Sequence, residues 1–183
     1  MAEQRKREFR RPREEAQDEF ENKMLGVRRV AKVVKGGRTL RTSALVVVGD
    51  KKGRVGMGLG KSNEMVLAID KAKKSAKKDL ITVPIINGTI PHETIGKFAK
   101  TQVKMLPSKQ GAGLICGGAA RTVFELAGYT DVTAKIYGST DKINVVRATL
   151  NGLKQLRTKE QIAMLRGKPV EEILGGNNGK KAR

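Results

Sequence analysis

Apolar and polar residues alternate over the first half of the chain in three segments, residues 24–34, 38–48 and 54–59. Alternation with a period of two is typical of strands that bury one face. On the second segment, that face carries Leu40, Thr42, Ala44, Val46 and Val48. The pair Gly36 and Gly37 separates the first two segments, and Gly-Asp-Lys-Lys-Gly separates the second from the third. Both interruptions favour turns, because glycine reaches positive φ easily, and the pattern predicts an antiparallel meander with one face toward the core.

A helical pattern follows the third segment, from Ser62 to about Leu80. Ser62 is a suitable N-cap, because its hydroxyl can accept a hydrogen bond from a backbone N–H of the first turn. Apolar residues three and four positions apart predict one buried stripe, formed by Met65, Ile69, Ala72, Ala76 and Leu80. Lysines cover much of the remaining surface, at Lys71, Lys73, Lys74, Lys77 and Lys78. They form either a solvated face or an RNA contact, and the sequence leaves both open.

The second half alternates between strand and helix patterns. Residues 81–107 look like strands interrupted by proline and glycine, and the glycine-rich residues 111–118 lead into a helix that Gly128 ends. Residues 130–137 alternate as a strand, and residues 144–156 form a helical pattern with an asparagine N-cap. Two strand-to-helix steps predict an α/β-type module.

These patterns divide the chain into five parts and predict an α+β fold. Residues 1–22 mix acidic and basic side chains, and we expect a disordered or partner-ordered extension. Residues 23–80 form the domain of meander and helix, and residues 81–157 form the α/β module. Residues 158–174 open with a Thr-Lys-Glu-Gln capping box, which predicts a terminal helix and protein-contact segment. Residues 175–183 are expected to be a disordered tail.

The net charge is +20, and it is localised. Residues 23–80 hold 16 Lys and Arg against four Asp and Glu. Such a patch favours a polyanionic partner. The candidate RNA-binding residues are Arg28, Arg29, Lys32, Lys35, Gly36, Gly37, Arg38, Arg41, Lys51, Lys52, Arg54 and Lys61. Because Gly36 and Gly37 have no side chains, the backbone of the first turn can approach a phosphate. The alternative to an RNA contact is an ordinary surface hairpin.

Aromatic residues are scarce, with four Phe, two Tyr and no Trp, and none lies in residues 23–80. Proteins that read single strands stack bases on aromatic side chains. Lysine, arginine and backbone amides suit structured, double-stranded RNA that is recognised by its shape. A β-β-β-α unit is also close to a double-stranded-RNA-binding domain without its first helix.

The glycine-rich residues 53–62 look like a nucleotide-binding loop. A P-loop requires glycine where Val55 stands, and the dinucleotide-binding pattern requires glycine where Lys61 stands. The preceding strands are also antiparallel rather than the start of a parallel unit. A strand over which another backbone passes closely is the plainer interpretation.

The chain offers little for metal or covalent chemistry. Cys116 is the only cysteine and His92 the only histidine, which excludes an internal disulfide and a zinc site with several such ligands. We expect Cys116 to be a small buried hydrophobe and His92 to be structural or RNA-facing, with no metal, cofactor or small-molecule substrate. No apolar run approaches the length of a membrane span, and the charged N-terminus lacks a secretory signal, so we expect no membrane contact and a cytoplasmic protein.

Four blocks together resemble the family of bacterial small-subunit ribosomal protein five. They are RVAKVVKGGRTLRTSALVVVGDKKGRVGMGLGKS (29–62), PHETIGKF (91–98), GAGLICGGAARTVFELAG (111–128) and KIYGSTDKINVVRATLNGL (135–153). The resemblance covers about residues 23–174. It implies a double-stranded-RNA-binding-like domain followed by a βαβ-type module with a left-handed crossover. It also implies a ribosomal, non-enzymatic constituent of the small subunit that binds small-subunit rRNA.

The resemblance further implies partners and site residues. The protein would contact small-subunit proteins four and eight and lie near the mRNA entry path. The residues of its hairpin that would approach the rRNA near the spectinomycin site are Ala31, Lys32, Val33, Lys35, Gly36, Gly37 and Arg38. Gly113 and Arg121 match positions at the contact with protein four, where changes alter translational accuracy. The residues alone leave the second glycine loop as a packing loop, a protein surface or an anion site; the resemblance implies the protein surface.

Two rival functions stay open at this point: a nucleotide-dependent enzyme, which Val55 already weakens, and a DNA-associated basic protein. Competition between duplex RNA and duplex DNA distinguishes a DNA-associated protein from an RNA-binding one, because an RNA-binding protein should prefer the RNA.

Overall fold

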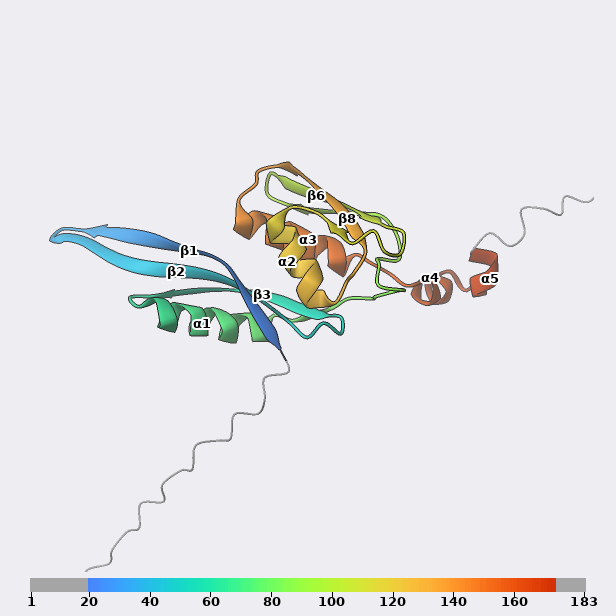
Figure 1. Ribbon diagram of the computed structural model, residues 1–183, viewed down its shortest axis with the longest axis horizontal. Helices are drawn as coiled ribbons and strands as arrows, with labels where there is room; N and C mark the ends of the chain where they lie inside the picture. The colour runs from blue at the N-terminus through green and yellow to red at the C-terminus, as the bar shows by residue number, and fades with distance from the viewer. Residues whose placement is uncertain (1–19, 174–183) are drawn as a thin grey trace, which may run out of the picture.

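The computed structural model describes residues 20–173, which form two four-stranded sheets with helices packed on them (Figure 1). The first module contains β1 (Glu21–Val34), β2 (Gly37–Gly49), β3 (Arg54–Ser62), α1 (Met65–Lys78) and β4 (Ile81–Thr82). The second module contains β5 (Thr94–Phe98), β6 (Thr101–Pro107), β7 (Leu114–Ile115), α2 (Gly118–Ala127), β8 (Val132–Gly138) and α3 (Lys142–Lys154). The short helices α4 (Lys159–Arg166) and α5 (Val170–Ile173) follow. The fold is α+β, as predicted.

The first sheet has the order β1-β2-β3-β4, and all its pairs are antiparallel. The meander predicted from alternation is therefore confirmed. The β1–β2 ladder continues to the pair Val34 and Gly37, so the turn is as tight as the glycine pair indicates. Figure 1 shows this hairpin extending beyond the start of α1, away from the second module.

The prediction that this sheet buries only one face is wrong. All five residues from Ala44 to Val48 are at most 4% exposed, so both sides of β2 are covered. Val46 and Val48 pack with Ala72 and Ala76 of α1 on one side. Val47 belongs to the core cluster that includes α2 and α3 on the other side. The second module thus covers the face that the isolated pattern leaves to solvent.

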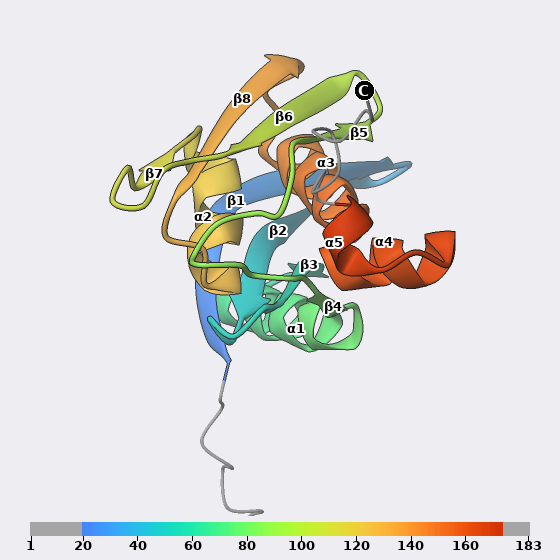
Figure 2. The same ribbon diagram turned by 90° about the vertical axis from the view of Figure 1, so that its right-hand side faces the viewer.

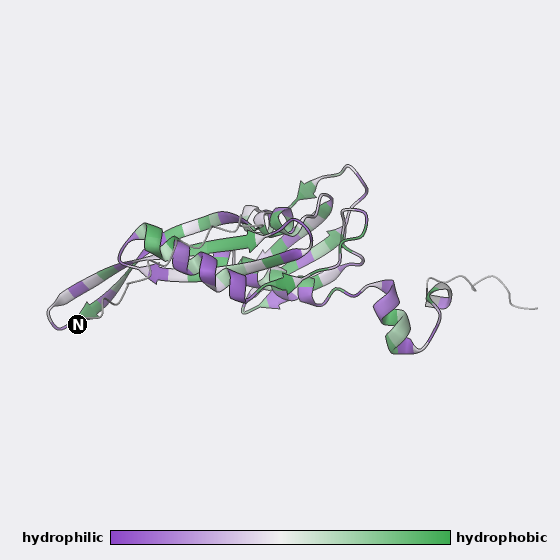
Figure 3. Cartoon of the chain, turned by 90° about the horizontal axis from the view of Figure 1, so that it is seen from below, coloured by the Kyte–Doolittle hydropathy of each residue, from purple (hydrophilic) through white to green (hydrophobic). Residues whose placement is uncertain are grey.

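The helix α1 starts later than the sequence predicts, because Ser62 is part of β3. Ser62 pairs with Thr42, and the N-cap of α1 is Glu64, whose side chain makes no capping hydrogen bond. The buried stripe is Ala68, Ala72 and Ala76, with Ile69 packed beside it. This confirms the predicted Ala72 and Ala76, whereas Met65, the predicted start of the stripe, is 46% exposed. Figure 3 shows hydrophilic residues along the outward side of this helix.

Three glycines of β3 let α1 lie directly on the strand. A Cβ on Gly58 would lie 2.0 Å from the carbonyl oxygen of Ala72, and one on Gly60 would lie 2.0 Å from that of Ala68. A Cβ on Gly56 would lie 2.6 Å from the carbonyl oxygen of Ala76. The glycine-rich residues are therefore a packing strand, which confirms the plainer interpretation over a nucleotide-binding loop.

The second sheet has the order β5-β6-β8-β7, and β7 and β8 form a parallel pair joined by α2. This is the predicted βαβ unit; the left hand of its crossover stays a prediction. Gly128 ends α2 in the left-handed conformation with φ 99°, as the sequence indicates. The helix α3 begins at Lys142 with Asp141 as its N-cap, three residues before the predicted N-cap, so Asn144 lies inside the helix and its predicted capping role is wrong.

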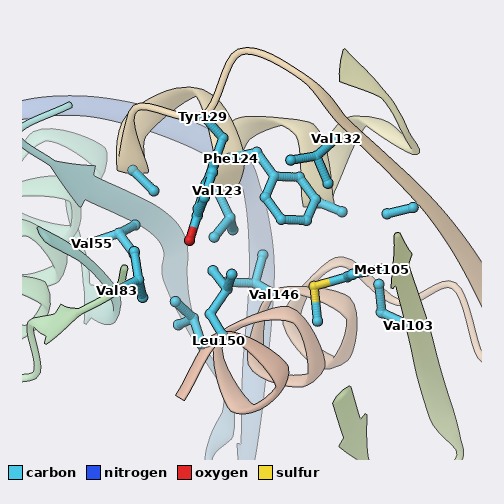
Figure 4. Close-up of a cluster of buried hydrophobic side chains, with 14 of the residues drawn as sticks. Val55, Val83, Val103, Met105, Val123, Phe124, Tyr129, Val132, Val146 and Leu150 are labelled. Carbon is cyan, nitrogen blue, oxygen red and sulfur yellow. The ribbon is translucent and has the colours of Figure 1, made fainter. Parts of the chain in front are cut away.

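One continuous core joins the two modules (Figure 4). Phe124 and Tyr129 pack edge to face, with ring centroids 5.9 Å apart. The Tyr129 hydroxyl points toward the side on which Val55 and Val83 lie and donates to the carbonyl oxygen of Pro84 at 2.9 Å. Burial of this side chain raises the pKa of Tyr129. A tyrosine from the second module thus satisfies the backbone of the segment that follows β4.

The chain ends fit the predicted division only in part. Residues 1–19 and 174–183 lie outside the described residues, so the predicted extension and tail are not described, and β1 begins inside the predicted extension. The capping box of α4 is present: the Thr158 hydroxyl accepts from the backbone of Gln161, whose side chain accepts from the backbone of Thr158. Within residues 20–173, no helix has the length and apolar character needed to cross a bilayer.

Candidate nucleic-acid interface

The β1–β2 hairpin places its cations according to strand register. Lys32 pairs with Thr39 and Val30 pairs with Arg41, and cross-strand partners share a face of the sheet. Lys61 at the end of β3 lines the same shallow hollow, of about 390 Å³, as Lys32 and Arg41. Three cations from three strands therefore meet on this face of the hairpin.

The opposite face of the hairpin combines two arginines with apolar side chains. Arg38 pairs with Val33 and Ala31 pairs with Leu40, and Arg29, two residues before Ala31, lies on the same face. All five side chains are exposed. At the tip, the Cβ positions of Gly36 and Gly37 have no atom within 4 Å, so nothing within the described residues covers the turn.

The tip cations, as we call them, are Arg29, Lys32, Lys35, Arg38, Arg41 and Lys61. No Asp or Glu occurs from residue 22 to residue 49. Within residues 20–173, none of the tip cations lies within ion-pair distance of a carboxylate. Their charge is therefore available to an external anion.

Three other candidates are committed to contacts inside the protein. Arg28 donates to Asp141 at 2.7 Å, and Lys51 pairs with Glu21. Arg54 donates through Nε to Asp50 at 2.6 Å and lies over the Phe20 ring at 5.0 Å. The structure therefore does not gather all the predicted RNA-binding residues on one surface.

The β2–β3 turn lies at the other end of the sheet from the tip (Figure 1). Its backbone binds the end of α2: Lys51 N–H donates to Leu126 and Gly53 N–H donates to Ala127, both at 2.9 Å. Lys52 and Lys51 are exposed on this turn. The predicted cations thus form two groups, and the six at the tip are the larger one.

Asp50 organises the β2–β3 turn. Its Oδ1 accepts from the backbone N–H of Lys52 at 2.8 Å and of Arg54 at 2.9 Å, and its side chain is only 2% exposed. Burial by itself raises the pKa of Asp50, but the hydrogen bonds from Arg54 and Lys52 outweigh burial, and the net pKa lies below its usual value. The turn is therefore built around an ionised carboxylate.

Acid is expected to destabilise the protein through this carboxylate. The folded protein holds Asp50 ionised more strongly than the unfolded chain does, so its contribution is present above the ordinary carboxyl pKa of about 4 and is lost as the pH falls through the lowered value. Urea unfolding between neutral pH and about pH 3 measures this loss. In Asp50→Asn the slope of stability against pH should be shallower; an unchanged slope would contradict this role.

The second predicted site, Gly113 and Arg121, lies on the βαβ unit. Gly113 precedes β7 with φ 74°, and its N–H donates to Asp131 Oδ1 at 2.8 Å. The hydrogen bond from Gly113 is the main cause that lowers the pKa of Asp131. Among the residues that the structure describes, no atom lies within 4 Å of a Cβ at Gly113, and the Arg121 side chain is 57% exposed. Both positions are therefore accessible to another protein.

Arg121 is also linked to the first module, which the sequence does not indicate. Its Nε donates to Glu125 Oε1 at 3.0 Å, and Glu125 Oε2 accepts from Lys23 of β1 at 2.8 Å. The hydrogen bond from Lys23 is the main cause that lowers the pKa of Glu125. Lys142 adds a second link from the second module by donating to the carbonyl oxygen of Leu25 at 2.9 Å.

Cys116 and His92 have structural surroundings. Cys116 is half-buried, and burial raises the pKa of its thiol to about 11, so the reactive thiolate is scarce at neutral pH. His92 Nδ1 lies 2.8 Å from the carbonyl oxygen of Glu93, and its Nε2 accepts from the Arg157 N–H at 3.3 Å. Among residues 20–173, no cluster of His, Cys, Asp and Glu could hold a metal ion.

Fold and surface together define a class: a two-module α+β protein whose cationic hairpin projects from a glycine-packed sheet. Comparison with known families makes the assignment specific. Residues 20–84 match the N-terminal domain of ribosomal protein S5, and residues 96–166 match its C-terminal domain.

Relatives agree with this match. Small ribosomal subunit protein uS5 of Aquifex aeolicus is 55% identical over 85% of this chain and 75% of its own length. The proteins of the same name from Mycoplasmopsis agalactiae and Ralstonia nicotianae are 54% and 50% identical over 88% of the chain, which corresponds to 70% and 94% of their lengths. The chain belongs to the ribosomal protein S5 family.

Proposed function

We propose that the protein is a structural constituent of the small ribosomal subunit and binds small-subunit rRNA through its β1–β2 hairpin. The observation that carries this proposal is the projecting tip, where six cations lack carboxylate partners among the described residues. The names of its relatives place those proteins in the small subunit. The function is therefore architectural, and the protein acts on the ribosome in the cytoplasm.

The chemistry of the tip suits the outer surface of folded RNA. Lysine and arginine side chains pair with phosphates, and the thin turn at Gly36 lets the backbone approach a groove. The hairpin carries no aromatic ring on which bases could stack. Recognition by shape and phosphate positions fits this surface better than recognition of base sequence.

The finer assignments follow from the family resemblance. The hairpin from Ala31 to Arg38 would approach the rRNA near the spectinomycin site. Gly113 and Arg121 would contact small-subunit protein four, and other surfaces would contact protein eight, with the mRNA entry path nearby. The exposure of Arg121 and the open space at Gly113 support a protein contact there.

Sedimentation of the native protein in a cell lysate tests the proposed function. The protein should travel with small ribosomal subunits and stay with them when subunits dissociate at low magnesium. A protein that stays at the top of the gradient, apart from ribosomal particles, would overturn the proposal.

Arg121→Leu is expected to raise misreading several-fold in a reporter of translational accuracy. The substitution removes an exposed cation from the proposed contact with protein four and also breaks the Arg121–Glu125 pair. A weakened contact would open more easily when the subunit closes during decoding.

Lys23→Gln provides the matched control, because it removes the other cation from Glu125 without changing the α2 surface. It should leave misreading near the wild-type level. If Lys23→Gln raises misreading as much as Arg121→Leu does, the effect comes from the link between modules, and the proposed interface is wrong.

A further inference from the structure

A cleft lies at the junction of the two modules, on the side away from the tip. Its volume is about 550 Å³, within the range of ligand sites. Met57 and Leu59 of β3 line it, together with the end of α1 and one side of α3. Figure 2 shows β3 and β4 between α1 and α3. Residues from both modules are thus needed to form it.

Three cations surround this cleft: Lys78 at the end of α1, and Arg147 and Lys154 on α3. All three side chains are exposed, and none pairs with a carboxylate among residues 20–173. Asp79 is the one acidic residue in the lining. Lys78 and Lys154 are the last residues of α1 and α3, where the helix dipole stabilises a positive charge. Arg147 lies in the middle of α3, so the helix dipole does not account for its position.

Arg147 is also held in a defined orientation. Its guanidinium carbon lies 4.9 Å from the centre of the half-buried Phe98 ring, which also lines the cleft. A guanidinium plane supported on one side by an aromatic ring can stack a base on its other side. The cleft therefore combines a stacking surface with two ammonium groups.

We propose that this cleft binds one unpaired nucleotide of RNA, with its base stacked on Arg147 and its phosphate held by Lys78 and Lys154. This site goes beyond the proposed function, because it takes single-stranded RNA on a surface distinct from the hairpin. Because its walls come from both modules, an occupied cleft also fixes their relative position.

A hexaribonucleotide with a single 2-aminopurine tests the site, since stacking quenches the fluorescence of this base. The full chain is used with Lys35→Gln and Arg38→Gln, so that the tip does not contribute. Saturable quenching is expected, and Arg147→Lys, which keeps the charge and loses the plane, should weaken binding about tenfold and abolish quenching. Lys154→Gln should weaken binding while quenching at saturation stays.

Lys135→Gln on β8 is the matched control and should bind like its parent. If the Arg147→Lys and Lys154→Gln proteins bind and quench as their parent does, the proposal is wrong. It is also wrong if the free 2-aminopurine nucleotide binds as tightly as the hexaribonucleotide, because the cleft would then be a small-molecule site. If Arg147→Lys fails to fold in a thermal melt, Lys154→Gln alone decides. The proposed function is tested separately, by the affinity of the tip for rRNA.

Discussion

Replacing Lys35 and Arg38 with glutamine is expected to weaken binding to a structured small-subunit rRNA fragment by about one to two orders of magnitude near 0.1 M salt. Each cation that neutralises a phosphate releases a counterion, and the plot of log affinity against log salt falls by about 0.7 to 0.9 per phosphate. Each removed cation should therefore flatten the slope by about one. Filter binding over a series of salt concentrations measures both quantities.

Lys100→Gln with Lys135→Gln is the control, because it removes the same charge from exposed positions of the second module. That variant should keep most of the affinity and the slope. Duplex RNA should also outcompete duplex DNA of the same length. Equal slopes for the two variants would mean that net charge, rather than the hairpin, drives binding, and equal affinity for DNA would favour the DNA-associated alternative.

Gly58→Ala is expected to lower the free energy of unfolding by about 3 kcal/mol or more, which places it in the destabilising tail of single substitutions. The new Cβ would lie 2.0 Å from the Ala72 carbonyl oxygen and 2.6 Å from the Ala76 nitrogen. Both atoms belong to the helix backbone, so α1 must move as a whole and lose its packing on Val46 and Val48. Urea unfolding followed by circular dichroism measures the loss.

Gly36→Ala is the matched control within the same sheet. In the described part of the chain, nothing lies within 4 Å of a Cβ at Gly36, and the free energy of unfolding of this variant should stay within about 0.5 kcal/mol of wild type. A Gly58→Ala protein as stable as wild type would contradict the close contact between α1 and β3.

Hydrophobic periodicity and turn residues predict the helices and strands, but they do not predict which other elements cover each face. Alternation and the glycine pair predict the β1–β2 hairpin, because strand period and turn are set by neighbouring residues. The burial of Leu45 and Val47 does not follow from local signals. Val47, for example, packs in the core that includes α2 and α3, more than 70 residues later in the chain. The local pattern favours Ser62 as a helix cap, but its pairing with Thr42 keeps it in the strand β3.

The same limit applies to the candidate site. The tip cations follow from charge and turn chemistry, and their RNA contact stays a prediction. Arg28 and Lys23 pair with Asp141 and Glu125, about 100 residues away, so no local pattern indicates that these cations link the modules. The cleft at Arg147 is formed by two modules and is invisible in either alone.

Cross-linking of the protein to rRNA in intact small subunits, with the linked peptides identified by mass spectrometry, tests the central claim most directly. Adducts should concentrate in the peptides that contain residues 29–41, at the tip of the β1–β2 hairpin. If those peptides carry none while other parts of the chain cross-link readily, the hairpin does not bind the rRNA and the proposed function is wrong.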